Sequence, residues 1–433
     1  MLHSILLDGF RSFEGNVALS LAPLTLLAGP NNVGKSSVIH ALLALVQSEQ
    51  AQSGDALLLS GLWSDLGGFD QVLNATRASD RRSFSIGLTG ELASGSPVDA
   101  VWRFGAPDDS AQPTAPVLEL EYKVQVGSSE FMGHVSRVSP GLFDWAEEVA
   151  REDGSRRATA HSGGATFVHP ADLSLLVRDP NAATNDPTRG YIGGKRLFLA
   201  PFDASRTHHI GPFRAPPRPL YTPRTSHLGP AIGRYGEHTA ELLFRNRTQR
   251  TDVLPHGQVS QPLLYAVNAW WSFIFGGSLA LQIDAPARLG YTLAIDTPSA
   301  ERLGLGQVGL GLSQTLPIIA ACLTSKPGDL LLVETPEAHL HPGAQHRLAN
   351  LFIELARCGR QLVVETHSEH LVNAVRLAVK SGLAPEQVSI VFFGQQDGRT
   401  TVQRIELDPH GRALQWPAGF FDQAAIDLAE LLR

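Results

Sequence analysis

The sequence predicts an α/β protein in which a parallel sheet carries a glycine-containing loop between a strand and a helix and a β-rich segment is inserted into the chain. Three observations support this fold class. An apolar strand at 24–28 leads into a loop with two glycines and then into a helix. Strands and helices alternate in the last third of the chain, which is typical of a parallel sheet. Between about residues 80 and 200, short alternating runs are separated by turns rich in Gly, Ser, Pro and Asp.

The loop spans residues 29–37 and reads Gly-Pro-Asn-Asn-Val-Gly-Lys-Ser-Ser. Gly29 and Gly34 let the backbone wrap closely around a triphosphate, whose charges then meet backbone N–H groups and the start of the following helix. Lys35 can reach the outer phosphates, and the Ser36 hydroxyl can coordinate magnesium. The residues expected to bind the nucleotide are Gly29, Asn31, Asn32, Gly34, Lys35, Ser36 and Ser37.

The last third of the chain is the most regular part. Its periodicity, caps and breakers predict helices at 313–323, 345–357 and 369–380, and strands at 291–295, 330–333, 361–364 and 388–393. Helices are also expected at 237–246 and 263–275, whereas the Pro- and Arg-rich stretch 200–235 reads as an irregular connection. Ligands of such a sheet bind at the carboxyl ends of its strands.

Polar side chains follow the predicted strands at those ends. Glu334 ends the apolar strand 330–333, where a P-loop protein needs a carboxylate for magnesium. His367 follows the next strand and can hydrogen-bond a γ-phosphate or orient water. Before the helix at 313, backbone amides and the Ser313 hydroxyl can form a second anion cradle.

Composition sets the broad class. The 433 residues have a net charge of −7 and no apolar run long enough to span a bilayer, and the N-terminus lacks the features of a signal peptide, so a cytoplasmic protein is expected. Residues 195–250 hold ten basic against three acidic residues, a local charge of +7. Within this segment Arg214, Arg218 and Arg224 can contact nucleic acid or an acidic partner, or form part of a solvated linker.

With these motifs in place, the sequence resembles the ABC/SMC-like branch of bacterial AAA-type ATPases, akin to RecF and the OLD proteins. The stretch GPNNVGKSS resembles their Walker A motif, LLLVETPEAHLHP their Walker B motif and its continuation, GLGLSQTLPI their signature region and VVETHSEH their histidine switch. Residues 416–422 resemble a C-terminal domain of unknown function attached to some of these ATPases. The resemblance implies a P-loop NTPase fold of the ABC-ATPase head type, here with a β-rich insertion.

The same resemblance implies that two copies dimerise head to head on ATP, with Gly311 and Ser313 of one copy touching the γ-phosphate held by the other. The family's second acid after the magnesium ligand is Thr335 here. Glu337 is the nearest replacement and, with His367 and Lys35, completes the expected catalytic set. Sustained heptads are absent, so no SMC-type coiled-coil arm is expected.

The predicted organisation has four parts: 1–75, the N-terminal half of the ATPase core; 76–200, a β-rich insertion; 201–255, a basic connection; and 256–433, the C-terminal half of the core with the C-terminal domain. The function predicted is an ATP- and magnesium-dependent ATPase that dimerises and drives a DNA-repair, DNA-transaction or anti-phage defence complex with a separate effector such as a nuclease. A nucleotide-gated scaffold with little or no hydrolysis remains an alternative, supported by Thr335. A standalone nuclease is disfavoured, because no acidic metal cluster is seen outside the P-loop site.

Overall fold

The computed structural model of the chain describes residues 1–51, 56–76, 82–91, 95, 97–109, 112–126, 128–140, 142–151, 155–168, 175–177, 204–225, 229–257, 259–286 and 289–432. The chain divides into two compact units. We call the first the antiparallel unit (residues 1–21, 36–204 and 397–400) and the second the parallel unit (22–35, 205–396 and 401–433). The predicted domain boundaries after residues 75, 200 and 255 stay a prediction.

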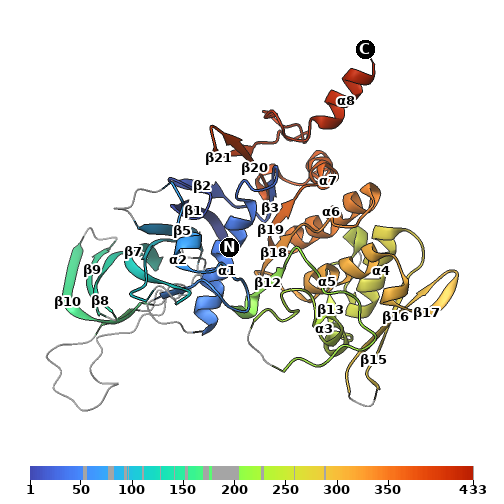
Figure 1. Ribbon diagram of the computed structural model, residues 1–433, viewed down its shortest axis with the longest axis horizontal. Helices are drawn as coiled ribbons and strands as arrows, with labels where there is room; N and C mark the ends of the chain where they lie inside the picture. Colours follow the sequence, from blue (N-terminus) through green and yellow to red (C-terminus); the bar gives the residue numbers. More distant parts are fainter. Residues whose placement is uncertain are drawn as a thin grey trace. The chain divides into compact units, whose positions relative to one another are not determined.

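The parallel unit is built on a six-stranded sheet of order β12–β18–β19–β3–β20–β21 (Figure 1). Neighbours from β12 to β20 run parallel. The strands are β3 (Leu24–Ala28), β12 (Thr207–Ile210), β18 (Leu330–Glu334), β19 (Gln361–Thr366), β20 (Val388–Gln396) and β21 (Arg399–Ile405). Every residue of β3, β18 and β19 is buried, as expected of parallel strands covered on both faces. This arrangement confirms the predicted α/β class with a parallel sheet.

Strand register sets which residues share the carboxyl edge of this sheet. Glu334 pairs with Glu365 across β18 and β19, and Ala28 pairs with Thr366 across β3 and β19. Gly29 and His367 each come one residue further along. The loop after β3 and the polar ends of β18 and β19 therefore lie on neighbouring strands of one sheet edge.

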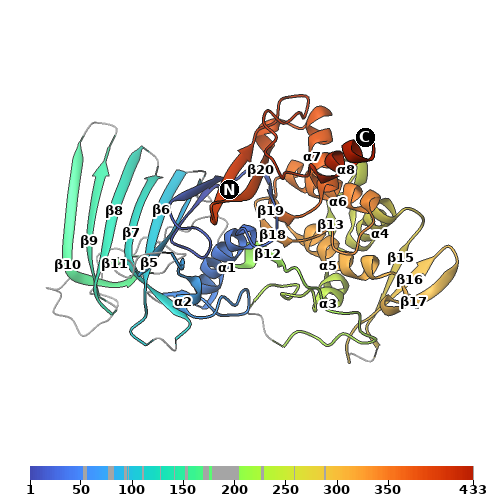
Figure 2. The same ribbon diagram turned by 45° about the horizontal axis from the view of Figure 1, so that its top comes forward.

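The predicted helices of this unit are confirmed, with ends shifted by at most three residues. They are α3 (Thr239–Asn246), α4 (Leu263–Phe275), α5 (Leu310–Thr324), α6 (Pro342–Arg357) and α7 (Glu369–Lys380). Helices α4, α5 and α6 pack against one another and α6 packs on β3 and β19, as Figure 2 lets the reader follow. Trp270 and Trp271, expected in the core, are 1% and 0% exposed on α4.

Some short elements differ from the prediction. Strand β12 lies in the stretch expected to be irregular, and β17 (Ala300–Gly304), which was not predicted, follows β16 (Thr292–Thr297). Strand β17 belongs to a small antiparallel sheet, β15–β16–β17. The remaining short elements of this unit are β13 (Arg250–Thr251), β14 (Gln261–Pro262), β15 (Ala280–Asp284), η1 (Ala204–Arg206), η2 (Pro255–Gly257), η4 (Leu305–Gln307) and η5 (Pro385–Gln387). These runs are too short to show a period of their own, so pairing rather than sequence pattern defines them.

The antiparallel unit contains a ten-stranded sheet of order β11–β10–β9–β8–β7–β6–β5–β1–β2, with β4 paired to β7. Its strands are β1 (Leu2–Asp8), β2 (Val17–Ser20), β4 (Ala56–Leu58), β5 (Ser83–Glu91), β6 (Pro97–Gly105), β7 (Thr114–Val126), β8 (Ser129–Ser139), β9 (Leu142–Ala150), β10 (Arg156–Val168) and β11 (Leu175–Val177). Helices α1 (Lys35–Ala51) and α2 (Phe69–Val72) complete the N-terminal part. The β-rich insertion is thus confirmed over its described residues, and β1 extends its sheet by pairing with β5.

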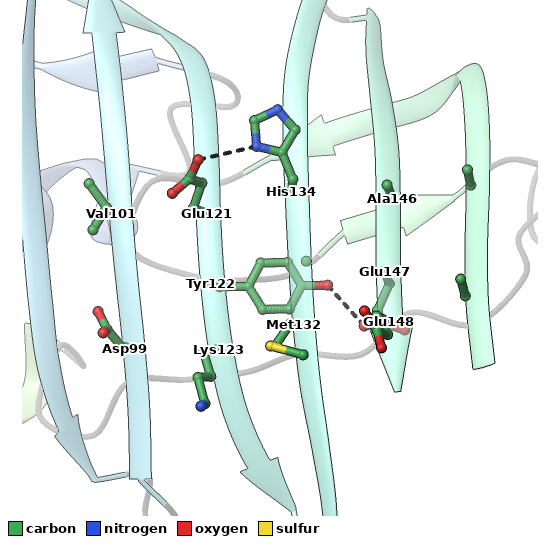
Figure 3. A pocket seen from close by; sticks show the side chains of 13 residues that line it. Asp99, Val101, Glu121, Tyr122, Lys123, Met132, His134, Ala146, Glu147 and Glu148 are labelled. Atoms are coloured by element: carbon green, nitrogen blue, oxygen red, sulfur yellow. Dashed lines mark hydrogen bonds and ion pairs between the residues drawn. The ribbon is translucent and has the colours of Figure 1, made fainter. Parts of the chain in front are cut away.

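The two faces of this sheet differ along β6 to β9. One face holds buried residues such as Trp102, Leu120 and Val135. The opposite face carries ion pairs and a hollow of about 690 Å³, shown in Figure 3, which is lined by Asp99, Val101, Glu121, Tyr122, Lys123, Met132, Gly133, His134, Ala146, Glu147, Glu148, Ala158 and Ala160. Alanines from β9 and β10 form part of its lining.

Tyr122 bridges three strands of this sheet. A Cβ atom at Gly133 would lie 2.2 Å from the Tyr122 Cζ atom, so the ring lies across β8 where only glycine fits. The phenol then donates to Glu147 Oε1 on β9 at 2.9 Å (Figure 3). The ring therefore covers Gly133 on β8, and the hydroxyl group links β7 to β9.

The chain's last described helix is α8 (Gln423–Leu431), with Ile426, Leu428 and Leu431 exposed. In the described part of the chain, no helix combines the length and the apolar character that crossing a membrane requires.

Candidate nucleotide site

The loop after β3 has the backbone of an anion-binding turn. Gly29, Asn32 and Gly34 have φ angles of 141°, 65° and 100°. A Cβ atom at Gly29 would lie 2.2 Å from the carbonyl oxygen of Phe393 on β20, so this position accepts glycine alone among the amino acids. Successive left-handed and right-handed residues turn backbone N–H groups toward one side, which makes a concave site for phosphate oxygens.

Lys35 lies inside this loop. Its side chain is 3% exposed, and Nζ donates hydrogen bonds to the carbonyl oxygens of Gly29, at 3.0 Å, and Pro30. Burial lowers the pKa of Lys35, while the carboxylates of Glu365 and Glu337 act in the opposite direction. The ammonium is thus placed at the loop and faces two acidic side chains from the ends of neighbouring strands.

The serines after Lys35 differ in accessibility. Ser36 is half-buried in the first turn of α1, whereas Ser37 is 7% exposed. Of the two, Ser36 offers the more accessible hydroxyl. Asn31 and Asn32 are exposed in the loop.

Glu334, the expected magnesium ligand, ends β18 and is 3% exposed. Its Oε1 accepts a hydrogen bond from Nε2 of His209 on β12 at 2.9 Å, and His209 is itself 1% exposed. Carboxylate and hydroxyl oxygens are the ligands that magnesium prefers, so Glu334 and Ser36 have the right chemistry for this ion. His209 was missed from the sequence, because nothing in the stretch 200–235 marked it as part of a strand.

Glu337 lies at the end of β19 because the chain turns sharply after β18. Thr335 has a φ of 42° and donates its N–H to the Glu365 carbonyl oxygen at 2.9 Å. Two residues later, Glu337 Oε1 accepts the backbone N–H of His367 at 2.6 Å. Burial raises the pKa of the Glu337 carboxyl group, opposed by that hydrogen bond and by the charge of Arg214.

His367 is exposed at the same edge. Burial of part of its ring and the nearby Lys35 cation lower its pKa, whereas a hydrogen bond with the Gly29 backbone raises it. Ser368 caps α7 by accepting the Leu371 N–H at 3.1 Å, which fixes the start of the helix next to this histidine. The structure therefore brings Lys35, Glu337 and His367 together, although they lie far apart in the sequence.

The signature region packs against the segment that follows Glu337. A Cβ atom at Gly311 would lie 2.7 Å from the His339 carbonyl oxygen, so the start of α5 approaches this backbone closely. Ser313 is 7% exposed, and its hydroxyl donates to the Leu310 carbonyl oxygen at 2.9 Å. The role of Gly311 and Ser313 toward a second copy stays a prediction.

Arg214 corrects one expectation. It was predicted as a contact for nucleic acid or a partner, but it is 8% exposed and donates to the backbone carbonyl oxygens of Glu334 and Thr335, each at 3.0 Å. Its burial leaves no surface for a macromolecule. Arg218 is exposed, and Arg224 is half-buried with its guanidinium bonded to the Gly229 carbonyl oxygen at 2.9 Å, so these two positions stay predictions.

Other basic residues of the 195–250 segment have partners within the parallel unit. Arg206 pairs with Asp329 at 3.3 Å, and Arg245 pairs with Glu241 at 2.6 Å. Lys195 and Arg196 lie outside the described residues. The local charge of +7 thus overstates the positive charge available to a nucleic acid.

Two family models match the chain. Residues 174–373 match the model described as "AAA domain, putative AbiEii toxin, Type IV TA system". Residues 383–431 match a protein of unknown function, DUF3696, which bears out the predicted C-terminal domain. A comparison with curated protein sequences found no match.

Solved SMC head domains resemble the chain at low identity. The SMC head domain from Thermotoga maritima is 13% identical, with 94% of this chain and 99% of that chain covered and a TM-score of 0.40. An Smc head domain with an extended coiled coil, bound to the C-terminal domain of ScpA from Pyrococcus furiosus, is 12% identical, with 100% and 99% covered and a TM-score of 0.39.

The family assignment therefore rests on the sequence models and on the motifs at the sheet edge. The AAA match contains the signature helix, Glu334, Glu337 and His367. The loop at 29–37 lies before the matched region in the sequence and follows β3, a central strand of the sheet. Residues 174–373 thus resemble an AAA-type ATPase domain, and residues 383–431 resemble a domain of unknown function that follows it in the chain.

Proposed function

We propose that the protein binds ATP with magnesium and hydrolyses it. The observation that carries this proposal is the meeting of Lys35, Glu337 and His367 at the carboxyl ends of β3, β18 and β19. Glu337 Oε1 lies 2.6 Å from the backbone nitrogen of His367, and both Glu337 and His367 act electrostatically on Lys35 or are acted on by it. A cation, a carboxylate and an imidazole at one phosphate-binding edge suit in-line attack of water on a γ-phosphate.

Each residue has a distinct role in this proposal. Lys35 exchanges its bonds to the Gly29 and Pro30 carbonyl oxygens for bonds to phosphate oxygens. Glu337 accepts a proton from the attacking water, and its raised pKa matches a general base better than an exposed glutamate does. His367, kept neutral by its lowered pKa, hydrogen-bonds the γ-phosphate. Magnesium, held by Ser36 and Glu334, would neutralise phosphate charge.

We further propose that two copies associate on binding ATP. Gly311 and Ser313 start helix α5, whose first N–H groups favour a bound anion. In the family resemblance, these residues reach the γ-phosphate bound by the second copy. Such a site would be complete only in the dimer, so nucleotide binding and assembly would be coupled.

The biological role we propose is a cytoplasmic ATPase that drives an anti-phage defence or DNA-transaction complex, including DNA repair. Support comes from the AAA model, whose description includes a putative toxin of a toxin–antitoxin system. A separate effector such as a nuclease would carry out the damage or repair step. Arg218 and Arg224 remain candidates for contact with nucleic acid or that effector.

A second candidate is a nucleotide-gated scaffold with little or no hydrolysis. The observation in its favour is Thr335, which occupies the position where the family places an acid. If Glu337 does not act as the base, ATP would bind and drive dimerisation without turnover.

ATP turnover by the purified protein, measured with its mass in solution by light scattering, separates the two candidates. The wild type is compared with Lys35→Ala and Glu337→Gln. The hydrolase predicts turnover in the wild type, loss in both variants, and ATP-dependent dimers that persist in Glu337→Gln. Dimerisation on ATP without turnover in the wild type would leave the scaffold and exclude the hydrolase.

A further inference from the structure

The segment after β12 reaches the Walker B end of the sheet. Strand β12 pairs in parallel with β18, so that Ile210 lies beside Val333 at its end. Four residues later, the Arg214 guanidinium donates to three carbonyl oxygens: those of Pro212 at 3.1 Å, Glu334 at 3.0 Å and Thr335 at 3.0 Å. One buried cation thus ties its own turn to the turn that follows β18.

The turn that Arg214 holds has an unfavourable backbone. Thr335 is β-branched, and its φ of 42° is a conformation that such residues rarely adopt. Left-handed backbone at a residue of this kind persists only where its surroundings enforce it. Three hydrogen bonds hold this conformation. Thr335 N–H donates to the Glu365 carbonyl oxygen, and the Thr335 carbonyl oxygen accepts from Arg214 at 3.0 Å and from the Ala338 N–H at 3.3 Å.

This turn decides where Glu337 lies. Because the chain reverses at Thr335, Glu337 comes back to the end of β19 and accepts the His367 N–H. The carboxylates of Glu334 and Glu337 also face the Arg214 charge, which compensates their burial. Arg214, which lies outside the Walker motifs, therefore both holds the backbone of this turn and compensates the charge of the two carboxylates.

We propose that Arg214 is a positioning residue of the nucleotide site, which holds the left-handed turn at Thr335 and so places Glu337 for catalysis. This inference rests on the proposed ATP hydrolysis, in which Glu337 is the base. Arg214 itself does not touch the reacting atoms. It acts through the two carbonyl oxygens and the carboxylate of Glu337.

The test uses the full-length protein with Arg214→Met, Arg214→Lys and, as a matched control, Arg247→Met. Arg247 is an exposed arginine of the same unit whose guanidinium donates to the Phe244 carbonyl oxygen and lies 4.2 Å from the centroid of the Phe244 ring. Arg214→Met is expected to lower kcat about 10- to 100-fold while KM for ATP changes less than about threefold, because misplacing a base affects the transition state more than binding. Arg214→Lys keeps the charge, so its kcat should lie between that of Arg214→Met and that of the wild type.

A double variant identifies the route of the effect. Asparagine tolerates left-handed backbone better than threonine, so Thr335→Asn should restore part of the lost kcat in Arg214→Met, by about threefold or more, and should change the wild type little. If Arg214 had only a general structural role, the double variant would lose as much kcat as the two single variants together. An unchanged kcat in Arg214→Met, with an active wild type, overturns the inference and leaves the proposed function intact.

Amide hydrogen exchange of the peptide covering 333–340 gives a readout that does not need turnover. Exchange there should accelerate about tenfold in Arg214→Met and stay unchanged in Arg247→Met. Unchanged exchange in Arg214→Met overturns the inference even if the wild type does not hydrolyse ATP. A wild type without turnover but with accelerated exchange in Arg214→Met removes the proposed function and keeps the positioning of the turn.

Discussion

The two large sheets place their charged residues in opposite ways. In the parallel unit, the strands β3, β18 and β19 are buried throughout, and ionisable groups gather at their carboxyl ends. In the antiparallel unit, exposed charged residues are spread along one face of β6 to β9 and the start of β10, as in the pairs Arg103–Glu119, Lys123–Glu130 and Arg156–Glu148. Charges that share a buried edge perturb one another, whereas charges on an open face are solvated.

This contrast gives a rule for reading substitutions. At the parallel edge, a change of one charged side chain should alter chemistry more than folding. On the antiparallel face, charged side chains should matter little and packed side chains should matter for stability alone. The five predictions below test this rule, beginning with the largest effect.

Replacing Glu337 with glutamine should lower ATP turnover about 10²- to 10⁴-fold, because the amide cannot act as a base. The same variant should unfold at a higher temperature at pH 7.5. Burial raises the pKa of Glu337, so its ionised form destabilises the folded state above that pKa, and this penalty disappears as the pH falls through it. Differential scanning calorimetry at pH 7.5 and at lower pH checks whether the gain in melting temperature shrinks on acidification.

The pH dependence of ATP turnover by the wild type should reflect the ionisation of Glu337. As the pH falls, kcat should drop through a pKa above 4.5, the ordinary value for glutamate. A kcat that stays constant down to pH 4.5 would contradict the assignment of Glu337 as the base.

Gly29→Ala should destabilise the parallel unit by about 3 kcal/mol and abolish nucleotide binding. An alanine here combines a φ of 141° with a Cβ atom 2.2 Å from the Phe393 carbonyl oxygen, so either the loop or β20 must move. Chemical denaturation and binding of a fluorescent ATP analogue measure the two effects. Gly95→Ala is the control: its φ is 81° but its Cβ atom would meet nothing within 4 Å. Equal losses in both variants would show that backbone strain, not the contact with β20, is responsible.

Tyr122→Ala should destabilise the antiparallel unit by about 3 kcal/mol without changing ATP affinity. The ring that covers Gly133 would be lost together with the hydrogen bond to Glu147. Tyr122→Phe keeps the ring and should cost about 1 kcal/mol. If Tyr122→Phe were as damaging as Tyr122→Ala, the hydroxyl and not the ring would tie the strands together.

Lys123→Met should change the free energy of unfolding by less than about 0.5 kcal/mol, although Lys123 Nζ lies 2.7 Å from Glu130. The lysine side chain is 57% exposed, so water and salt screen the pair. A loss above 1 kcal/mol in urea denaturation would show that the open face is not merely solvated.

The residues of the candidate nucleotide site that lie next to predicted strands could be identified from the sequence. Those that reach the site only through long-range contacts could not. The sequence predicted that the loop 29–37, Glu334 and His367 share one sheet edge, because Glu334 ends an apolar strand, the loop and His367 each follow one, and parallel strands bring their carboxyl ends together. The helices were found because they are long and periodic.

His209 and Arg214 were missed or misread for a physical reason. Strand β12 has four residues, two of them histidines, and exists because it pairs with β18, more than a hundred residues away. The Pro and Gly residues after it are typical of an irregular connection, and the excess of arginines favoured the prediction that these side chains lie on the surface. Burial of Arg214 depends on carbonyl oxygens of Glu334 and Thr335 that no sequence pattern places nearby.

The two hydrogen bonds from Lys35 to the loop's own carbonyl oxygens have a consequence for how fast nucleotide can enter. Because the ammonium is already seated at the loop, arrival of a triphosphate is an exchange of acceptors and needs no ordering of a disordered segment. Association should therefore be a single bimolecular step whose rate rises in proportion to ATP concentration, without the plateau that a slow loop rearrangement imposes.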